Sequence, residues 1–122
     1  MSFGIHLRGL TADKARALWQ INTWWWNSKE LREELDFVDV SRDPGYTDFA
    51  ATVDRAKAQD LAKRFRPREK HHKKSARRLD VALAQPECTH VVITLFEWEM
   101  APPSDWIPGV TDVQEQEARR KW

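Results

Sequence analysis

A chain of 122 residues has the length of one ordinary domain and can bury a hydrophobic core without disulfides or structural metals. Its single cysteine, Cys88, excludes an internal disulfide, and no stretch approaches the roughly 18 apolar residues of a membrane-spanning helix. The 20 Lys and Arg nearly balance the 19 Asp and Glu, so the chain as a whole is neither a polycation nor a polyanion. We therefore expect a cytoplasmic protein with no secretion leader and no membrane segment.

The first part of the chain alternates apolar and polar residues from Phe3 to Leu7, the period of a strand with one dry face. Gly9 ends that strand, and Thr11 has the character of a helix N-cap. An apolar stripe at helical spacing then predicts a helix that reaches Trp25 or Trp26. Asn27 either caps a further helical stretch or lies within the same helix.

The middle of the chain predicts one short strand and two helices. Residues 37–40 are the strand, which a Pro-Gly turn at 44–45 stops. Thr47 and Asp48 open the next helix, which Pro67 should end near Arg66. The third helix is expected over residues 68–84.

The stretch from His90 to Met100 is the only long run rich in β-branched and aromatic residues, and it predicts the central strand. Its first half is apolar on both faces. In its second half Phe96 and Trp98 point to one face, whereas Glu97 and Glu99 point to the other.

The C-terminal part is expected to contain a proline-rich loop over residues 101–110, pinned to the body by Trp106 and Ile107, and a short helix over residues 111–122. The predicted order is β-α-β-α-α-β-α in a single domain over residues 1–122. This order indicates an α/β protein, with α+β as the alternative, in which three to four helices cover a sheet of three or slightly more strands.

The near-neutral total charge hides a basic segment over residues 63–78, with nine basic residues and one acid. The remainder then carries 11 basic against 18 acidic residues, so a segment near +8 is joined to a body near −7. Such a segment either remains a solvated face paired with the acidic body or binds an anionic partner such as nucleic acid. Its basic residues are Lys63, Arg64, Arg66, Arg68, Lys70, Lys73, Lys74, Arg77 and Arg78.

Three consecutive tryptophans, Trp24, Trp25 and Trp26, are the most unusual local feature. Consecutive residues of a helix point about 100° apart, so three indoles cannot all face one core. Either two of them bury and the third lies under the loop around Trp106, or at least one anchors a protein interface.

Candidate catalytic pairs are sparse. Glu97 and Glu99 would stand roughly 7 Å apart on one strand, a separation at which two carboxylates can share acid and base duties. Cys88 and His90 have the same spacing and offer a nucleophile and base or two metal ligands. His71 and His72 are adjacent on an expected helix and are interpreted as ordinary polar residues, so we expect no metal and no cofactor.

These patterns favour a small binding protein that occludes another protein, such as a toxin or an enzyme domain, in the manner of an immunity protein, antitoxin or inhibitor. Two alternatives stay open: nucleic-acid binding through the basic segment, and a small enzyme that uses Glu97 with Glu99 or Cys88 with His90. The expected partner-binding residues are Trp24, Trp26, Glu97, Trp98 and Glu99.

Overall fold

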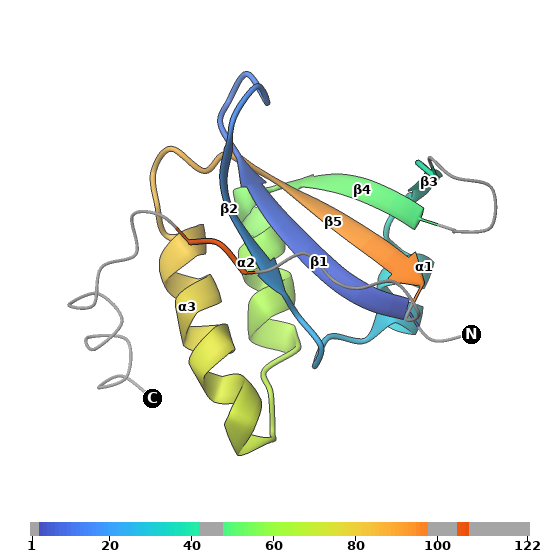
Figure 1. Ribbon diagram of the computed structural model, residues 1–122, viewed down its shortest axis with the longest axis vertical. Coiled ribbons are helices and arrows are strands. Elements are labelled where there is room, and N and C mark those ends of the chain that lie inside the picture. Colours follow the sequence, from blue (N-terminus) through green and yellow to red (C-terminus); the bar gives the residue numbers. More distant parts are fainter. Residues whose placement is uncertain (1–2, 42–47, 98–104, 108–122) are drawn as a thin grey trace.

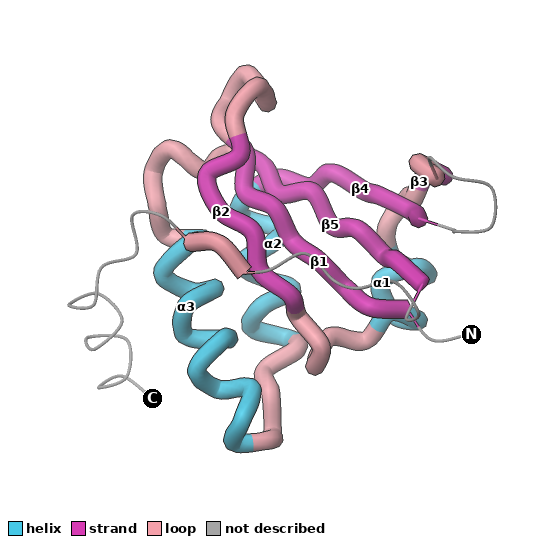
Figure 2. Tube along the Cα trace, in the orientation of Figure 1, coloured by secondary structure: helices cyan, strands magenta, loops and turns pink. Residues whose placement is uncertain are grey.

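The computed structural model describes residues 3–41, 48–97 and 105–107, which form an antiparallel five-stranded sheet in the order β2-β1-β5-β4-β3 (Figure 1). Helices α2 and α3 lie side by side against one face of this sheet, and α1 packs at the end of β1 on that same side (Figure 2). The elements in chain order are β1 (Phe3–Leu10), β2 (Ala17–Asn22), α1 (Ser28–Glu34), β3 (Val38–Asp39), β4 (Asp48–Asp54), α2 (Arg55–Arg64), the 3-10 turn η1 (Lys70–His72), α3 (Lys73–Leu83) and β5 (His90–Glu97).

The prediction that β5 is the central strand is confirmed. β5 pairs with β1 on one side and with β4 on the other, both antiparallel. Val91, Ile93 and Leu95 are fully buried on the face that α2 and α3 cover. The apolar run at the start of β5 therefore forms the middle of the core.

The predicted helix between Thr11 and Trp26 is wrong, because β2 forms there and pairs with β1 as a hairpin. Thr11 and Asp13 close the hairpin loop: the Asp13 carboxylate accepts hydrogen bonds from the Thr11 hydroxyl at 2.6 Å and from the Ala15 backbone N–H at 3.0 Å. Lys14 completes the turn with a φ of 59°. The same residue types cap helices and close loops, which is why the local signal is ambiguous.

Burial of Trp19 and Ile21 decides the conformation of β2. Both side chains are fully buried and alternate with Leu18 and Gln20, the period of a strand. The Trp19 indole lies directly over Gly9, where an added Cβ would come within 2.3 Å of the ring. A glycine in β1 thus makes room for the largest side chain of the core.

The predicted helix from Thr47 to Arg66 is wrong in its first half. Residues Asp48–Asp54 form β4, and the helix proper, α2, begins at Arg55. Asp54 is its N-cap, because the carboxylate accepts a hydrogen bond from the Lys57 backbone N–H at 2.7 Å. α2 ends at Arg64, ahead of Pro67 as expected.

The third predicted helix is present in shorter form. The residues from Lys70 to His72 form the 3-10 turn η1, and α3 continues from Lys73 to Leu83. The short strand predicted over residues 37–40 appears as β3. Asn27 caps a separate helix, α1, through a 3.0 Å hydrogen bond from the Glu30 backbone N–H to its side-chain oxygen.

The fold is therefore α+β, with an antiparallel sheet of five strands rather than three and with three α-helices among the described residues. Of the expected C-terminal loop and helix, only Asp105–Ile107 falls within the described residues. There the backbone of Trp106 pairs with Gln20 at the edge of β2, and Ile107 packs against the core, as predicted. None of the described helices has the length and apolar character to cross a membrane.

Candidate functional surfaces

The sheet has a second face, here called the outer face, that no described helix covers (Figure 2). Its residues alternate along the strands with those of the core, so they point away from α2 and α3. They are Gly4, His6, Arg8, Gln20, Asn22, Ala50, Thr52, Val92, Thr94 and Phe96.

Trp24 lies at one end of the outer face and is 37% exposed. Its ring meets Phe96 edge to face, with 6.0 Å between the ring centroids. Phe96 in turn lies flat over Gly4, where an added Cβ would come within 2.3 Å of the ring. The lack of a side chain at Gly4 therefore makes room for the Phe96 ring, and this ring packs against Trp24.

Trp106 adds a second exposed aromatic side chain beside β2, with 49% of its surface accessible. The backbone N–H of Trp106 donates to the Gln20 backbone carbonyl at 2.9 Å, and the backbone carbonyl of Trp106 accepts from the Gln20 backbone N–H at 2.7 Å. Residues that face each other across such a bridge share a face, so Trp106 belongs with the outer face. The backbone N–H and side-chain amide of Asn22 both donate to the Asp105 carboxylate, at 2.9 and 3.1 Å, which anchors this segment further.

Between these aromatic residues the outer face is polar. His6 is buried there, beside Asn22 on β2 and Thr94 on β5. Burial lowers the pKa of His6, and the Arg8 charge lowers it further, although Asp105 and Gln20 act in the opposite direction. The ring is therefore a neutral, hydrogen-bonding group at pH 7.

The other two tryptophans of the triplet have different surroundings. Trp26 is only 5% exposed and packs against Phe65 in the core, so this burial disfavours the partner contact expected at Trp26, which stays a prediction. Trp25 is half-buried against the His72 ring, at 5.4 Å between centroids. The three indoles diverge as the sequence predicts, but they do so from an irregular loop instead of a helix.

Of the predicted acidic pair, only Glu97 falls within the described residues. Glu99 lies outside them, as does Trp98, which was expected to contact a partner. Glu97 is half-buried at the end of β5. Burial raises the pKa of Asp48, and the charges of Glu97 and Asp39 raise it further. These carboxylates make this end of the sheet acidic.

Cys88 and His90 are not arranged as a catalytic pair. The Cys88 thiol is fully buried, its pKa is raised by that burial, and it donates to the His90 backbone carbonyl at 3.7 Å. The His90 ring instead contacts the Thr89 hydroxyl at 2.9 Å. A buried thiol with a raised pKa stays protonated and is a poor nucleophile.

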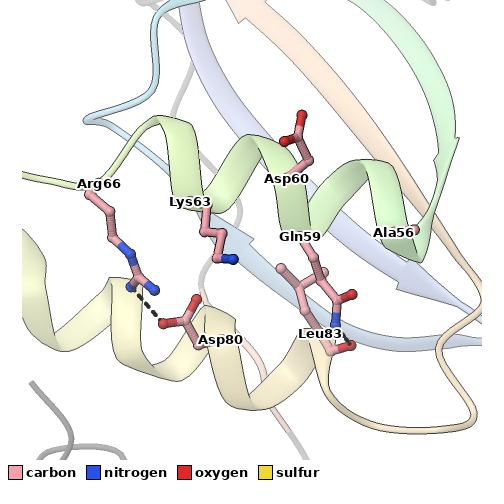
Figure 3. Close-up of a pocket in the computed structure, with 7 residues that line it drawn as sticks. All are labelled: Ala56, Gln59, Asp60, Lys63, Arg66, Asp80 and Leu83. Atoms are coloured by element: carbon pink, nitrogen blue, oxygen red, sulfur yellow. Dashed lines mark hydrogen bonds and ion pairs between the residues drawn. The ribbon is translucent and has the colours of Figure 1, made fainter.

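The basic segment divides into two parts. One part is joined to acidic residues, because Arg64 pairs with Glu34 on α1 and with Asp60, and Arg66 pairs with Asp80 on α3 at 2.6 Å. Figure 3 shows the Arg66–Asp80 pair in a groove of about 480 Å³ between α2 and α3. The groove is lined by Ala56, Gln59, Asp60, Lys63, Arg66, Asp80 and Leu83, so its two basic and two acidic groups balance.

The second part lies where α2 connects to α3, at the bottom of Figure 1, and is here called the cationic tip. Arg68, Lys70 and Lys73 form no ion pair with any residue in the described ranges. Trp25 and His72 flank them. Lys74, Arg77 and Arg78 follow along α3.

Sequence reasoning missed Trp106 as a candidate contact, although a lone tryptophan in a proline-rich segment was a usable signal. Comparisons of the chain with protein-family models, curated proteins and solved structures found no match. The function must therefore be argued from these surfaces alone.

Proposed function

We propose that this is a small cytoplasmic binding protein, not an enzyme, which uses its outer face to occlude another protein. The observation that carries the proposal is the presence of Trp24 and Trp106, both exposed, on the sheet face that no described helix covers. Tryptophan is the residue type most enriched among energetically dominant interface contacts.

The construction of the outer face supports this use. Trp24 rests on Phe96 and Trp106 is hydrogen-bonded to β2 through its backbone, so both are held before a partner arrives. Preorganised anchors lose less conformational entropy on binding. The polar side chains of this face that reach its surface, including Arg8 and Gln20, would supply specificity.

We infer the partner class from the extent of the outer face and from the acidity of the body. A stable protein complex buries about 800 Å² on each partner, which requires an extended surface. The best candidate is a toxin or enzyme domain whose active surface is cationic, because complementary charge accelerates encounter and selects the partner.

The test is quantitative capture of partners from the native host by the wild type and by Trp24→Ala and Trp106→Ala. We expect one stoichiometric partner with the wild type and a loss of at least about 2 kcal/mol of affinity in each variant. Trp25→Ala is the matched control, because it removes an indole of the same triplet that packs against His72 and the core and is not part of the outer face. Retention of the partner by both Trp24→Ala and Trp106→Ala would refute the proposal.

A second function, binding of single-stranded nucleic acid, is favoured by the cationic tip. There Arg68, Lys70 and Lys73 would contact phosphates, while Trp25 offers a ring on which a base can stack. The ion pairs of Arg64 and Arg66 reduce the number of cations available for this role.

Fluorescence anisotropy with labelled single-stranded DNA and RNA, at about 50 and about 200 mM salt, tests this second function. Three phosphate contacts predict a slope of about −2 in log affinity against log salt, because each contributes roughly 0.7 for single strands. The variant Arg68→Gln/Lys70→Gln/Lys73→Gln should lose this binding, whereas Trp24→Ala should retain it. Absence of salt-sensitive binding by the wild type eliminates the nucleic-acid function.

A further inference from the structure

Two histidines and a glutamate come together at the 3-10 turn η1, directly before α3. Glu69 precedes η1, and His71 and His72 belong to it. One carboxylate oxygen of Glu69 lies 3.1 Å from His71 Nε2 and 3.7 Å from His72 Nε2. All three donor atoms lie within 4.8 Å of one another.

The 3-10 turn explains why adjacent histidines converge, contrary to what their position in the sequence suggests. The His72 N–H donates to the Glu69 carbonyl at 3.1 Å, and residues three apart eclipse each other in a 3-10 turn. This places the Glu69 side chain next to the His72 ring. The His71 ring folds back toward the same point, with 4.0 Å between the two ring centroids.

We propose that Glu69, His71 and His72 bind a zinc ion. Imidazole nitrogens and a carboxylate oxygen are the ligands of zinc sites that keep a fourth position open. Bonds of about 2.0 to 2.2 Å in tetrahedral geometry separate ligand atoms by roughly 3.3 to 3.6 Å, and the two distances from Glu69 lie on either side of that range.

Packing fixes the side chain of His72, whereas the exposed side chains of His71 and Glu69 are free to rotate. The His72 side chain is 21% exposed and packs against Trp25, whereas that of His71 is 70% exposed. Small rotations of the His71 and Glu69 side chains therefore suffice to close the ligand set around an ion. A water molecule would supply the fourth ligand.

The neighbouring charges set the strength of this site. Arg68, Lys70 and Lys73 are adjacent in sequence to the ligands and repel a divalent cation. We therefore expect zinc to bind reversibly and more weakly than in sites with several thiolate ligands.

The experiment is a titration of the full-length, tag-free chain with Zn²⁺ against a chromophoric chelator, and with Co²⁺, whose visible absorption reports tetrahedral coordination. We expect one equivalent to bind to the wild type and affinity to fall at least about tenfold in Glu69→Gln, His71→Ala and His72→Ala, since loss of an outer support alone costs about 10- to 100-fold. His90→Ala removes a histidine outside the cluster and should bind as the wild type does.

Circular dichroism without metal should be the same for all four variants, because Glu69, His71, His72 and His90 all lie outside the core. If one variant is misfolded, the other two still test the site. Equal affinity of the wild type and the Glu69, His71 and His72 variants would overturn the proposal, as would Mg²⁺ competing with Zn²⁺ at equal concentration.

Discussion

Gly9 is the residue on which the packing of the β1–β2 hairpin depends. The Trp19 indole occupies the space of a side chain at this position, with 2.3 Å from its nearest atom to an added Cβ. Gly9→Ala should force the indole from its place and destabilise the fold by about 1 to 3 kcal/mol, the usual cost of overfilling a core. Urea unfolding followed by tryptophan fluorescence measures this change.

Arg8→Ala is the control for that substitution. Arg8 is the exposed neighbour of Gly9 on β1, and we expect its replacement to change stability by less than about 0.5 kcal/mol. Equal stability of Gly9→Ala and the wild type would contradict the packing described for Trp19.

Cys88 provides a second test at the scale of one residue. Because its thiol is fully buried and its pKa is raised by burial, we expect it to react with a disulfide reagent only when the protein opens. The rate of thiol modification in buffer and in denaturing urea measures this protection. A fast reaction in buffer would show an accessible thiolate and would revive the alternative of a cysteine enzyme.

At the scale of elements, Glu34 connects α1 to α2. Its carboxylate pairs with Arg64 and, at 2.5 Å, with Lys57. The hydrogen bonds from Arg64 and then from Lys57 lower the pKa of Glu34 to about 2. A carboxyl whose pKa is lower in the folded chain stabilises the fold above its unfolded pKa, and this contribution is lost as the pH falls toward the folded value.

We therefore expect Glu34→Gln to lower the melting temperature at pH 6 but to have little effect at pH 2. Thermal unfolding of both proteins across this range measures the difference, which should disappear between about pH 4.5 and 2. Added salt should reduce it, because the pairs are partly exposed. Glu33→Gln is the control on the same helix, and an identical pH profile for both variants would contradict the assignment.

Elements could be predicted from the sequence where the spacing of apolar residues, or a proline or capping residue, fits only one type of secondary structure. The β-branched run from Val91 to Leu95 identified β5, and Pro67 marked the break between α2 and the region of α3. The Asn27 cap of α1 was one of two alternatives that the sequence left open, and the hydrogen bond from the Glu30 N–H to the Asn27 side chain decides between them.

The two missed strands lie where local signals and tertiary packing disagree. Thr11 with Asp13, and Thr47 with Asp48, resemble helix starts, and the alanines near residue 50 favour a helix. Pairing with β1 and β5 overrides these preferences, because a hairpin partner and a buried face are long-range features. No local pattern reports them.

The candidate sites depend on the same distinction. The divergence of the three tryptophans was expected from helix geometry but arises in a loop, and the burial of Trp26 depends on Phe65, far along the chain. The meeting of Glu69 with His71 and His72 required a 3-10 turn in place of the expected α-helix. The 3-10 conformation of η1 thus decides whether Glu69, His71 and His72 are separate polar residues or a candidate ligand set.

At the scale of the whole molecule, different roles fall on different surfaces. One sheet face forms the core with the helices, the opposite outer face carries Trp24 and Trp106, and the far end of the helical hairpin carries the cationic tip (Figure 1). Glu34 on α1, together with Asp60 on α2 and Asp80 on α3, partly neutralises the basic residues of these two helices. The main functional question is therefore which of the two exposed surfaces receives the partner.

Hydrogen–deuterium exchange of the free chain and of its complex with the captured partner answers that question most directly. We expect slower exchange on binding over residues 17–24 and 105–107, which include β2 and both exposed tryptophans, and unchanged exchange over residues 63–74. Protection confined to residues 63–74, with residues 17–24 and 105–107 unchanged, would place the partner on the cationic tip and contradict the proposed use of the outer face.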